Sequence, residues 1–154
     1  MKIKPFLAFL CFLLSVKGFS QNTISLIDEV VEQIKLEIPN LRMEYMAELL
    51  NGYKRAFYKD KVPLIIEVEE TERIKKNVCW YYFKENLIFT ETVWTDTVSG
   101  RKLHHEKTYH SKDRMIVWMD NESTFVDASS SEYINLEKAL SAYSKKIYLE
   151  AKQQ

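Results

Sequence analysis

The stretch Trp80-Tyr-Tyr-Phe-Lys-Glu-Asn-Leu-Ile-Phe-Thr90 decides the fold. It consists of an aromatic run, a short Lys-acidic-polar break and an aliphatic run, which is the pattern of two antiparallel strands joined by a tight turn. Two further segments follow the same plan, so the sequence predicts three successive hairpins with turns that begin at Lys59, Lys84 and Lys112. We expect three-residue turns, in which Asn86 takes the left-handed conformation.

The strands on either side of these turns are predicted to form one antiparallel meander. The segment is dense in Thr, Val, Ile and aromatic residues, which are enriched in strands. The predicted six strands span residues 53–58, 62–69, 74–83, 86–95, 102–110 and 114–119.

Helices are predicted at both ends of this sheet. Apolar residues recur at three- and four-residue spacing from Ser25 to Ile38, and Pro39 ends that pattern. The C-terminal helix is expected to start with a capping box of Ser129 and Glu132. Its apolar stripe comprises Tyr133, Leu136, Leu140, Tyr143 and Ile147.

The segment from Leu41 to Asn51 is interpreted as a short second helix, because Leu41, Tyr45 and Leu49 lie at helical spacing. The fold class that follows is α+β: a six-stranded antiparallel meander sheet flanked by an N-terminal and a C-terminal helix. We expect the helices to pack against one face of the sheet.

The first twenty residues have the three parts of a cleavable secretory signal. Lys2 and Lys4 precede an apolar run over residues 6–14, and small residues follow at Gly18 and Ser20. The run is shorter than the roughly 20 apolar residues that span a bilayer. We therefore predict a signal peptide over residues 1–20, a single domain over 21–154, and a periplasmic or secreted location; a retained membrane anchor is the alternative.

Composition excludes several classes of function. The chain has 22 Lys+Arg and 22 Asp+Glu residues, and cleavage after Ser20 would leave 19 basic against 22 acidic side chains. This balance argues against nucleic-acid binding, which needs an excess of basic side chains on one surface. Only three glycines are present, so a Gly-rich phosphate loop is not expected.

Cleavage would also leave a single cysteine. Cys11 lies inside the apolar run, so Cys79 would be the sole thiol and no internal disulfide is expected. The apolar neighbours of Cys79 favour a buried structural thiol over a nucleophile.

The hairpin pattern from Trp80 to Thr90 resembles that of small exported Bacteroidota-type proteins of unknown function with repeated aromatic β-hairpins. In that group the turn usually contains a glycine, which is absent here. The resemblance covers about residues 24–120 in outline. It implies a periplasmic or secreted location and no assigned catalytic residue. The resemblance also implies that the Asp96-Thr97-Val98 triplet is an acceptor of an O-glycan. The alternative is a chance match in a surface loop.

Alternation of side chains along the strands predicts two different faces. One gathers Tyr81, Phe83, Leu87, Phe89, Tyr109, Met115, Val117 and Met119, and suits a core under helices. The other gathers Val78, Trp80, Tyr82, Ile88, Thr90, Thr92, Trp94, His104, His110, Ile116 and Trp118. Rings with polar tips often line ligand surfaces, although aromatic residues on a sheet also form core. The ligand-binding hypothesis rests on Trp80, Tyr82, Thr90, Thr92, Trp94, His110 and Trp118.

No metal site, cofactor or catalytic residue is predicted. His104 and His110 share a face but lie six residues apart on a strand, about 20 Å, which is too far for one zinc ion. His105 points to the opposite face. The acidic run from Glu67 to Glu72 is interpreted as a solvated strand edge or turn.

The favoured hypothesis is an exported, non-catalytic binding or protein-interaction module for a small molecule, glycan or envelope protein. Its contact with the membrane is through the export signal only. This hypothesis would fail if Trp80, Trp94 and Trp118 were all inaccessible to solvent beneath the helices. The alternative is a cell-envelope hydrolase that uses His104 and nearby carboxylates. A third hypothesis is an inhibitor whose acidic cluster docks on a basic protein.

Overall fold

The computed structural model describes residues 21–154; the expected signal peptide lies outside the described residues. Seven antiparallel strands form one sheet in chain order. They are β1 (Arg42–Leu49), β2 (Gly52–Lys59), β3 (Val62–Thr71), β4 (Ile74–Phe83), β5 (Asn86–Asp96), β6 (Lys102–Ser111) and β7 (Arg114–Met119). Two helices, α2 (Gln21–Glu37) and α3 (Ser131–Lys152), flank the sheet, and the short 3-10 helix η1 (Ile38–Asn40) follows α2. The predicted α+β meander with terminal helices is confirmed, with one strand more than expected.

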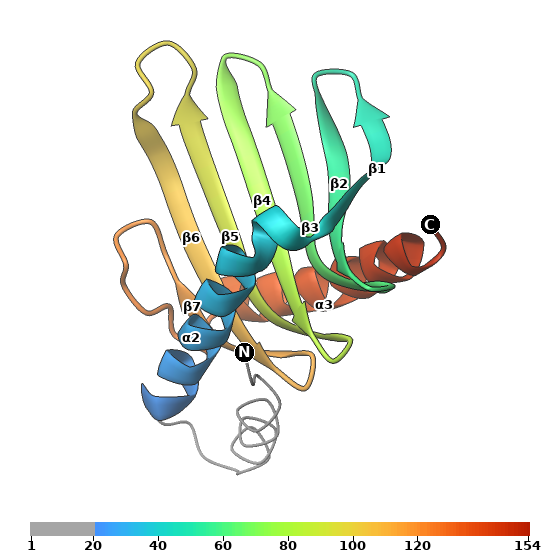
Figure 1. Cartoon of the computed structure of the whole chain (residues 1–154). Coiled ribbons are helices and arrows are strands. Elements are labelled where there is room, and N and C mark those ends of the chain that lie inside the picture. The colour runs from blue at the N-terminus through green and yellow to red at the C-terminus, as the bar shows by residue number, and fades with distance from the viewer. Residues whose placement is uncertain (1–20) are drawn as a thin grey trace.

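The two helices lie on opposite faces of the sheet (Figure 1). Helix α2 crosses one face and α3 crosses the other, and the upper parts of the hairpins extend beyond both helices. The expectation that both helices share one face was wrong. Both faces of the lower sheet carry large apolar side chains, such as Tyr81 on one and Tyr82 on the other, so each face needs a cover.

The extra strand is β1, in the segment that we interpreted as a second helix. Leu41, Tyr45 and Leu49 fit helical spacing, but the segment instead forms a backbone ladder with β2 from Arg42 opposite Tyr58 to Leu49 opposite Gly52. The helix prediction was wrong because a neighbouring strand satisfies the backbone groups of this segment, and tertiary pairing overrides a weak local propensity.

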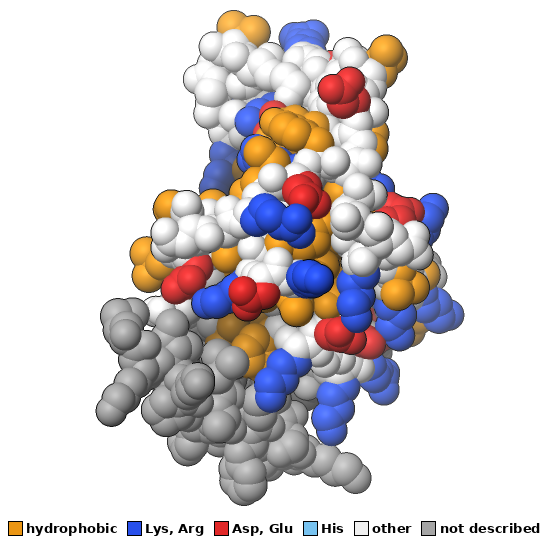
Figure 2. Space-filling view, turned by 45° about the vertical axis from the view of Figure 1, so that its right-hand side comes forward, with side chains coloured by type: hydrophobic (Ala, Val, Ile, Leu, Met, Phe, Trp, Pro, Cys, Tyr) orange, Lys and Arg blue, Asp and Glu red, His pale blue; other side chains and the backbone are white. Residues whose placement is uncertain are grey.

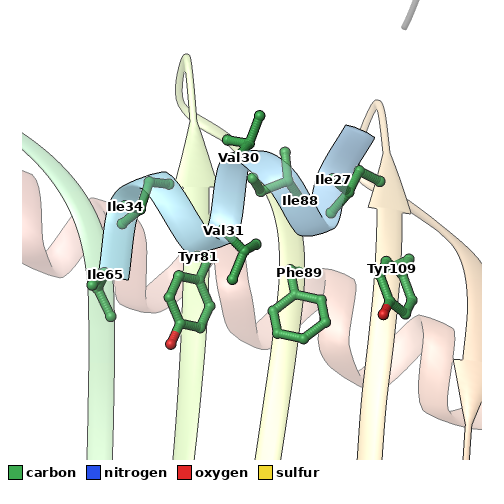
Figure 3. Packing of buried hydrophobic residues seen from close by; sticks show 9 residues of the cluster. All are labelled: Ile27, Val30, Val31, Ile34, Ile65, Tyr81, Ile88, Phe89 and Tyr109. Atoms are coloured by element: carbon green, nitrogen blue, oxygen red, sulfur yellow. The ribbon is translucent and has the colours of Figure 1, made fainter. Parts of the chain in front are cut away.

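Helix α2 buries one apolar stripe, which consists of Ile27, Val30, Val31 and Ile34. These side chains meet Ile65, Tyr81, Phe89 and Tyr109 on the sheet (Figure 3). The predicted start, Ser25, lies inside the described helix, which ends one residue before Ile38. Among residues 21–154, neither helix is long and apolar enough to cross a bilayer.

Helix α3 begins one residue later than the predicted capping box implies. The Ser130 hydroxyl, and not that of Ser129, accepts a hydrogen bond from the Tyr133 N–H at 3.1 Å. The C-terminal half of α3 is held by Ile147, Tyr148 and Ala151, which pack on the sheet. At this end the Tyr58 hydroxyl donates to the Ala151 carbonyl at 2.9 Å.

The hairpin turns are shorter than predicted. In two of them, both central residues have positive φ: Lys84 and Glu85 at 49° and 68°, and Lys112 and Asp113 at 52° and 61°. These angles are typical of two-residue type I′ turns, whose twist matches that of the flanking strands. Asn86 is therefore the first residue of β5 and not the left-handed residue.

We expect Glu85→Gly to raise the free energy of unfolding by about 1 kcal/mol, because glycine has no Cβ to oppose the left-handed conformation. The variant also loses the exposed Glu85–Lys152 ion pair of 2.7 Å, which contributes little. Urea unfolding measures the change. Glu85→Ala is the matched control, since it loses the same ion pair and keeps the Cβ; an equal gain in that control would contradict the prediction.

Candidate functional site

All three tryptophans lie on the face of the sheet that α3 crosses, which we call the tryptophan face. Trp80 pairs with Thr90, Thr90 with Thr108, and Thr108 with Trp118 across β4 to β7. Trp94 lies four residues beyond Thr90 on β5 and so points to the same side. The predicted grouping of the tryptophans on one face is confirmed.

Because of two β-bulges, four residues lie on the opposite face of the sheet from the one that was predicted. The register shifts next to Tyr81 and Tyr82 and again next to Tyr109 and His110. Leu87 consequently packs on the α3 side and Ile88 on the α2 side. Likewise Met115 pairs with His110 on the tryptophan face, while Ile116 packs under α2. One extra residue in a strand reverses the alternation beyond it.

Helix α3 covers the lower half of the tryptophan face. The Trp80 ring lies 5.5 Å from that of Tyr143, and the Tyr82 hydroxyl donates to the Ser144 carbonyl at 2.9 Å. Trp80 and Tyr82 are 5% and 2% exposed, and Thr90 is buried as well. These sequence-predicted ligand residues therefore form core under α3.

A buried hydrogen-bonded chain runs through this covered half. The Thr90 and Thr108 hydroxyl oxygens are 2.5 Å apart, and the Thr108 hydroxyl is 2.7 Å from His110 Nε2. Burial lowers the pKa of His110 to about 4, so its ring is neutral at pH 7. The predicted ligand residue His110 is thus a buried member of a polar chain.

The upper half of the tryptophan face carries no helix (Figure 1). Here Lys76, Trp94 and His104 lie side by side on β4, β5 and β6. The Trp94 and His104 rings are 4.5 Å apart, and Lys76 Nζ lies 5.3 Å from the centre of the Trp94 ring. Trp94 is half-buried, and so are Thr92 and Trp118. The three tryptophans are therefore not all hidden beneath the helices.

A hollow of about 420 Å³ adjoins this row at the tips of the first hairpins. Leu50, which is 98% exposed, and Ile74 supply apolar surface, and Glu70 and Lys76 supply charge. The full lining comprises Leu49, Leu50, Asn51, Glu70, Glu72, Arg73, Ile74 and Lys76. We call this hollow, together with Lys76, Thr92, Trp94 and His104, the open site. The sequence pattern missed the hollow, because it joins two turns that are distant along the chain.

The histidines do not converge. His104 Nε2 lies 3.3 Å from Glu106 Oε2 on the tryptophan face, whereas His105 Nε2 lies 2.8 Å from Glu91 Oε1 on the other face. His110 is buried. No group of three or more metal-ligating side chains is found within residues 21–154.

The opposite face of the sheet, which α2 crosses, carries an ion-pair network that the sequence did not reveal. Glu67, only 8% exposed, accepts hydrogen bonds from Arg55 and from the Asn77 amide, both at 2.5 Å. Burial opposes ionisation of Glu69, but hydrogen bonds from Lys75 and Tyr53 outweigh it and lower the Glu69 pKa. The prediction that the acidic run is solvated is therefore partly wrong. The cross-strand register places Arg55 opposite Glu67, and it places Tyr53 and Asn77 opposite Glu69.

Cys79 lies on the same face of the sheet as this network, between the network and α2. Burial raises the pKa of its thiol to about 12, and Sγ donates to Asn77 Oδ1 at 3.2 Å. The thiol is protonated at neutral pH and a poor nucleophile.

The Asp96-Thr97-Val98 triplet lies where β5 enters the loop to β6. The Thr97 hydroxyl donates to the Arg73 carbonyl at 2.9 Å, and Val98 is 91% exposed.

No protein-family model matches the chain, and neither does any curated protein or solved structure.

Proposed function

We propose that the chain is an exported, non-catalytic binding module that holds its ligand or partner at the open site. The observation that carries this proposal is the row of Lys76, Trp94 and His104, which no described helix covers, beside a hollow of about 420 Å³. Export is inferred from the sequence of residues 1–20 alone.

The groups in the open site suit recognition. A tryptophan, a lysine and a histidine offer apolar area, a cation and a hydrogen-bonding ring, and Thr92 adds a hydroxyl. Cross-strand pairs fix their positions on rigid strands, so little side-chain entropy is lost on binding. The described thiol, that of Cys79, lies on the other face and is protonated, which fits a non-catalytic function.

The site favours an envelope protein over a small molecule or a glycan. The His104 ring lies 4.5 Å from the Trp94 ring and Lys76 Nζ lies over the Trp94 ring at 5.3 Å from its centre, so neighbouring side chains already contact the ring on which a sugar would stack. The hollow lies at the hairpin tips, whereas small-molecule sites usually enclose most of the ligand. A partner with a broad, matching surface can contact the row and the hollow together.

A photo-crosslinking amino acid at position 92 tests this proposal in exporting cells. We expect adducts with a defined protein of the cell envelope from position 92, because Thr92 adjoins Trp94 on the tryptophan face. The matched control is position 93, which is also half-buried but faces away. Trp94→Ala, combined with the crosslinker at position 92, should reduce the adduct yield by about ten-fold, as for a central interface tryptophan.

Equal adduct yields from positions 92 and 93, or a yield that Trp94→Ala leaves unchanged, would contradict the proposal. Iodide quenching of variants that keep a single tryptophan provides an independent check. Iodide should quench the fluorescence of Trp94 more strongly than that of Trp80. Equal protection of the two rings from iodide would show that the tryptophan face is closed to solvent.

The hydrolase alternative is supported by the His104–Glu106 contact of 3.3 Å. It predicts that the purified protein cleaves a chromogenic ester and that His104→Ala abolishes the cleavage. An activity that survives His104→Ala would exclude this mechanism.

A further inference from the structure

The sheet has two edges, and among the described residues only the β7 edge has outer partners, which contact its last two residues. At β7, Met119 forms a bridge with Phe125, and the Val126 N–H donates to the Trp118 carbonyl at 2.9 Å. At the other edge, β1 pairs with β2 and no further described strand lies outside it. An open edge presents unpaired backbone N–H and C=O groups, which pair readily with another strand.

The residues of this edge form a self-complementary pattern. Met43 and Tyr45 of β1, with Leu41 immediately before the strand, alternate with Arg42 and Glu44. Met43 and Tyr45 point to the α2 side, where they are 38% and 59% exposed. Arg42 and Glu44 point to the other side, and their side chains are 2.7 Å apart. Figure 2, which brings the β1 side forward, shows hydrophobic side chains among charged ones on this part of the molecule.

We propose that β1 pairs antiparallel with β1 of a second copy of the chain, about a two-fold axis at Met43. This register places Arg42 opposite Glu44 of the partner subunit, and Glu44 opposite Arg42 of the partner subunit. On the other face, Leu41 lies opposite Tyr45 of the partner subunit, and the two Met43 side chains meet. Every charged pair is then attractive and every apolar pair is buried.

The neighbouring registers are less favourable. A two-fold axis at Glu44 would place two carboxylates opposite each other. An axis at Tyr45 would place Met43 opposite Ala47 of the partner subunit, although the bulge between Tyr45 and Ala47 turns Ala47 to the other face. The bulge therefore limits regular pairing to Leu41–Tyr45.

The pairing closes on itself. A two-fold contact uses the same edge, that of β1, on both copies, so it leaves no further β1 edge to pair. The product is a dimer with a continuous sheet of two copies, and not a fibre.

Charge reversal tests the register. Arg42→Glu and Glu44→Arg should each weaken self-association of the purified protein by about ten-fold or more, because four like charges then meet at the axis. An equimolar mixture of these two variants should form a heterodimer, since the acidic pair at positions 42 and 44 of one chain then faces the basic pair at the same positions of the other. Glu48→Arg is the matched control, because Glu48 is an exposed β1 residue beyond the bulge and should leave the dimer intact.

Light scattering after size-exclusion chromatography measures the oligomeric state of the native protein and of each variant, at protein concentrations between about 1 and 500 μM. Circular dichroism confirms folding, and Tyr45→Ala provides an uncharged variant that should also weaken the dimer. A monomeric native protein over this range would overturn the proposal. So would a dimer that both charge reversals leave unchanged, or a mixture that forms no heterodimer.

Discussion

Replacing Phe89 by alanine is expected to lower the free energy of unfolding by about 3–5 kcal/mol, the usual range for a buried phenylalanine. Phe89 is 2% exposed and lies under α2 (Figure 3). Its ring centre is 5.6 Å from that of Tyr81 and 5.1 Å from that of Tyr109. Truncation removes both ring contacts and leaves a cavity that rigid strands on either side cannot close.

Urea unfolding monitored by circular dichroism measures this loss. Val98→Ala is the control, because Val98 is 91% exposed in the loop after β5 and should change stability by less than about 0.5 kcal/mol. A loss below about 1 kcal/mol for Phe89→Ala would mean that α2 does not pack on this face as described.

Gly52→Ala is expected to destabilise the protein by about 3 kcal/mol or more, since a side chain there requires the backbone to move. A Cβ on Gly52 would overlap the carbonyl oxygen of Glu69 on the neighbouring strand. Close approach of two backbones, and not an unusual φ angle, makes glycine necessary at this position.

Gly100→Ala is the comparison for this prediction. Gly100 has φ of +69°, but a Cβ added there would meet no atom within 4 Å, so alanine should cost only about 1 kcal/mol for the left-handed conformation. Thermal unfolding of both variants measures the difference. Similar losses for the two would show that the clash at Gly52 is relieved cheaply and that the β2–β3 contact is looser than described.

Only part of the candidate site, Thr92 and Trp94, follows from the predicted ligand residues. Residues 74–83 and 86–95 were predicted as strands nearly to their ends, because alternating side chains and turn residues are local signals. Strand positions then fix the side to which Trp80, Trp94 and Trp118 point. Which of them meets solvent depends on α3, which covers Trp80 and leaves Trp94 half-buried.

Other features arise only when strands pair. The network of Arg55, Glu67 and Asn77 joins three strands, so no single stretch of sequence displays it. The exchange of Leu87 with Ile88 comes from a bulge, which depends on how β4 and β5 match along their length.

The sequence by itself determined three of the hairpins, the order of the six predicted strands and the two terminal helices, because each follows from spacing and turn chemistry over a few residues. The tertiary structure decided that residues 42–49 form a strand, since apolar residues at this spacing suit a helix or a half-exposed strand, and only pairing with β2 selects one. It also decided that the helices take opposite faces. Both faces are apolar in the lower sheet, and burying both removes more apolar surface from water than covering one face twice.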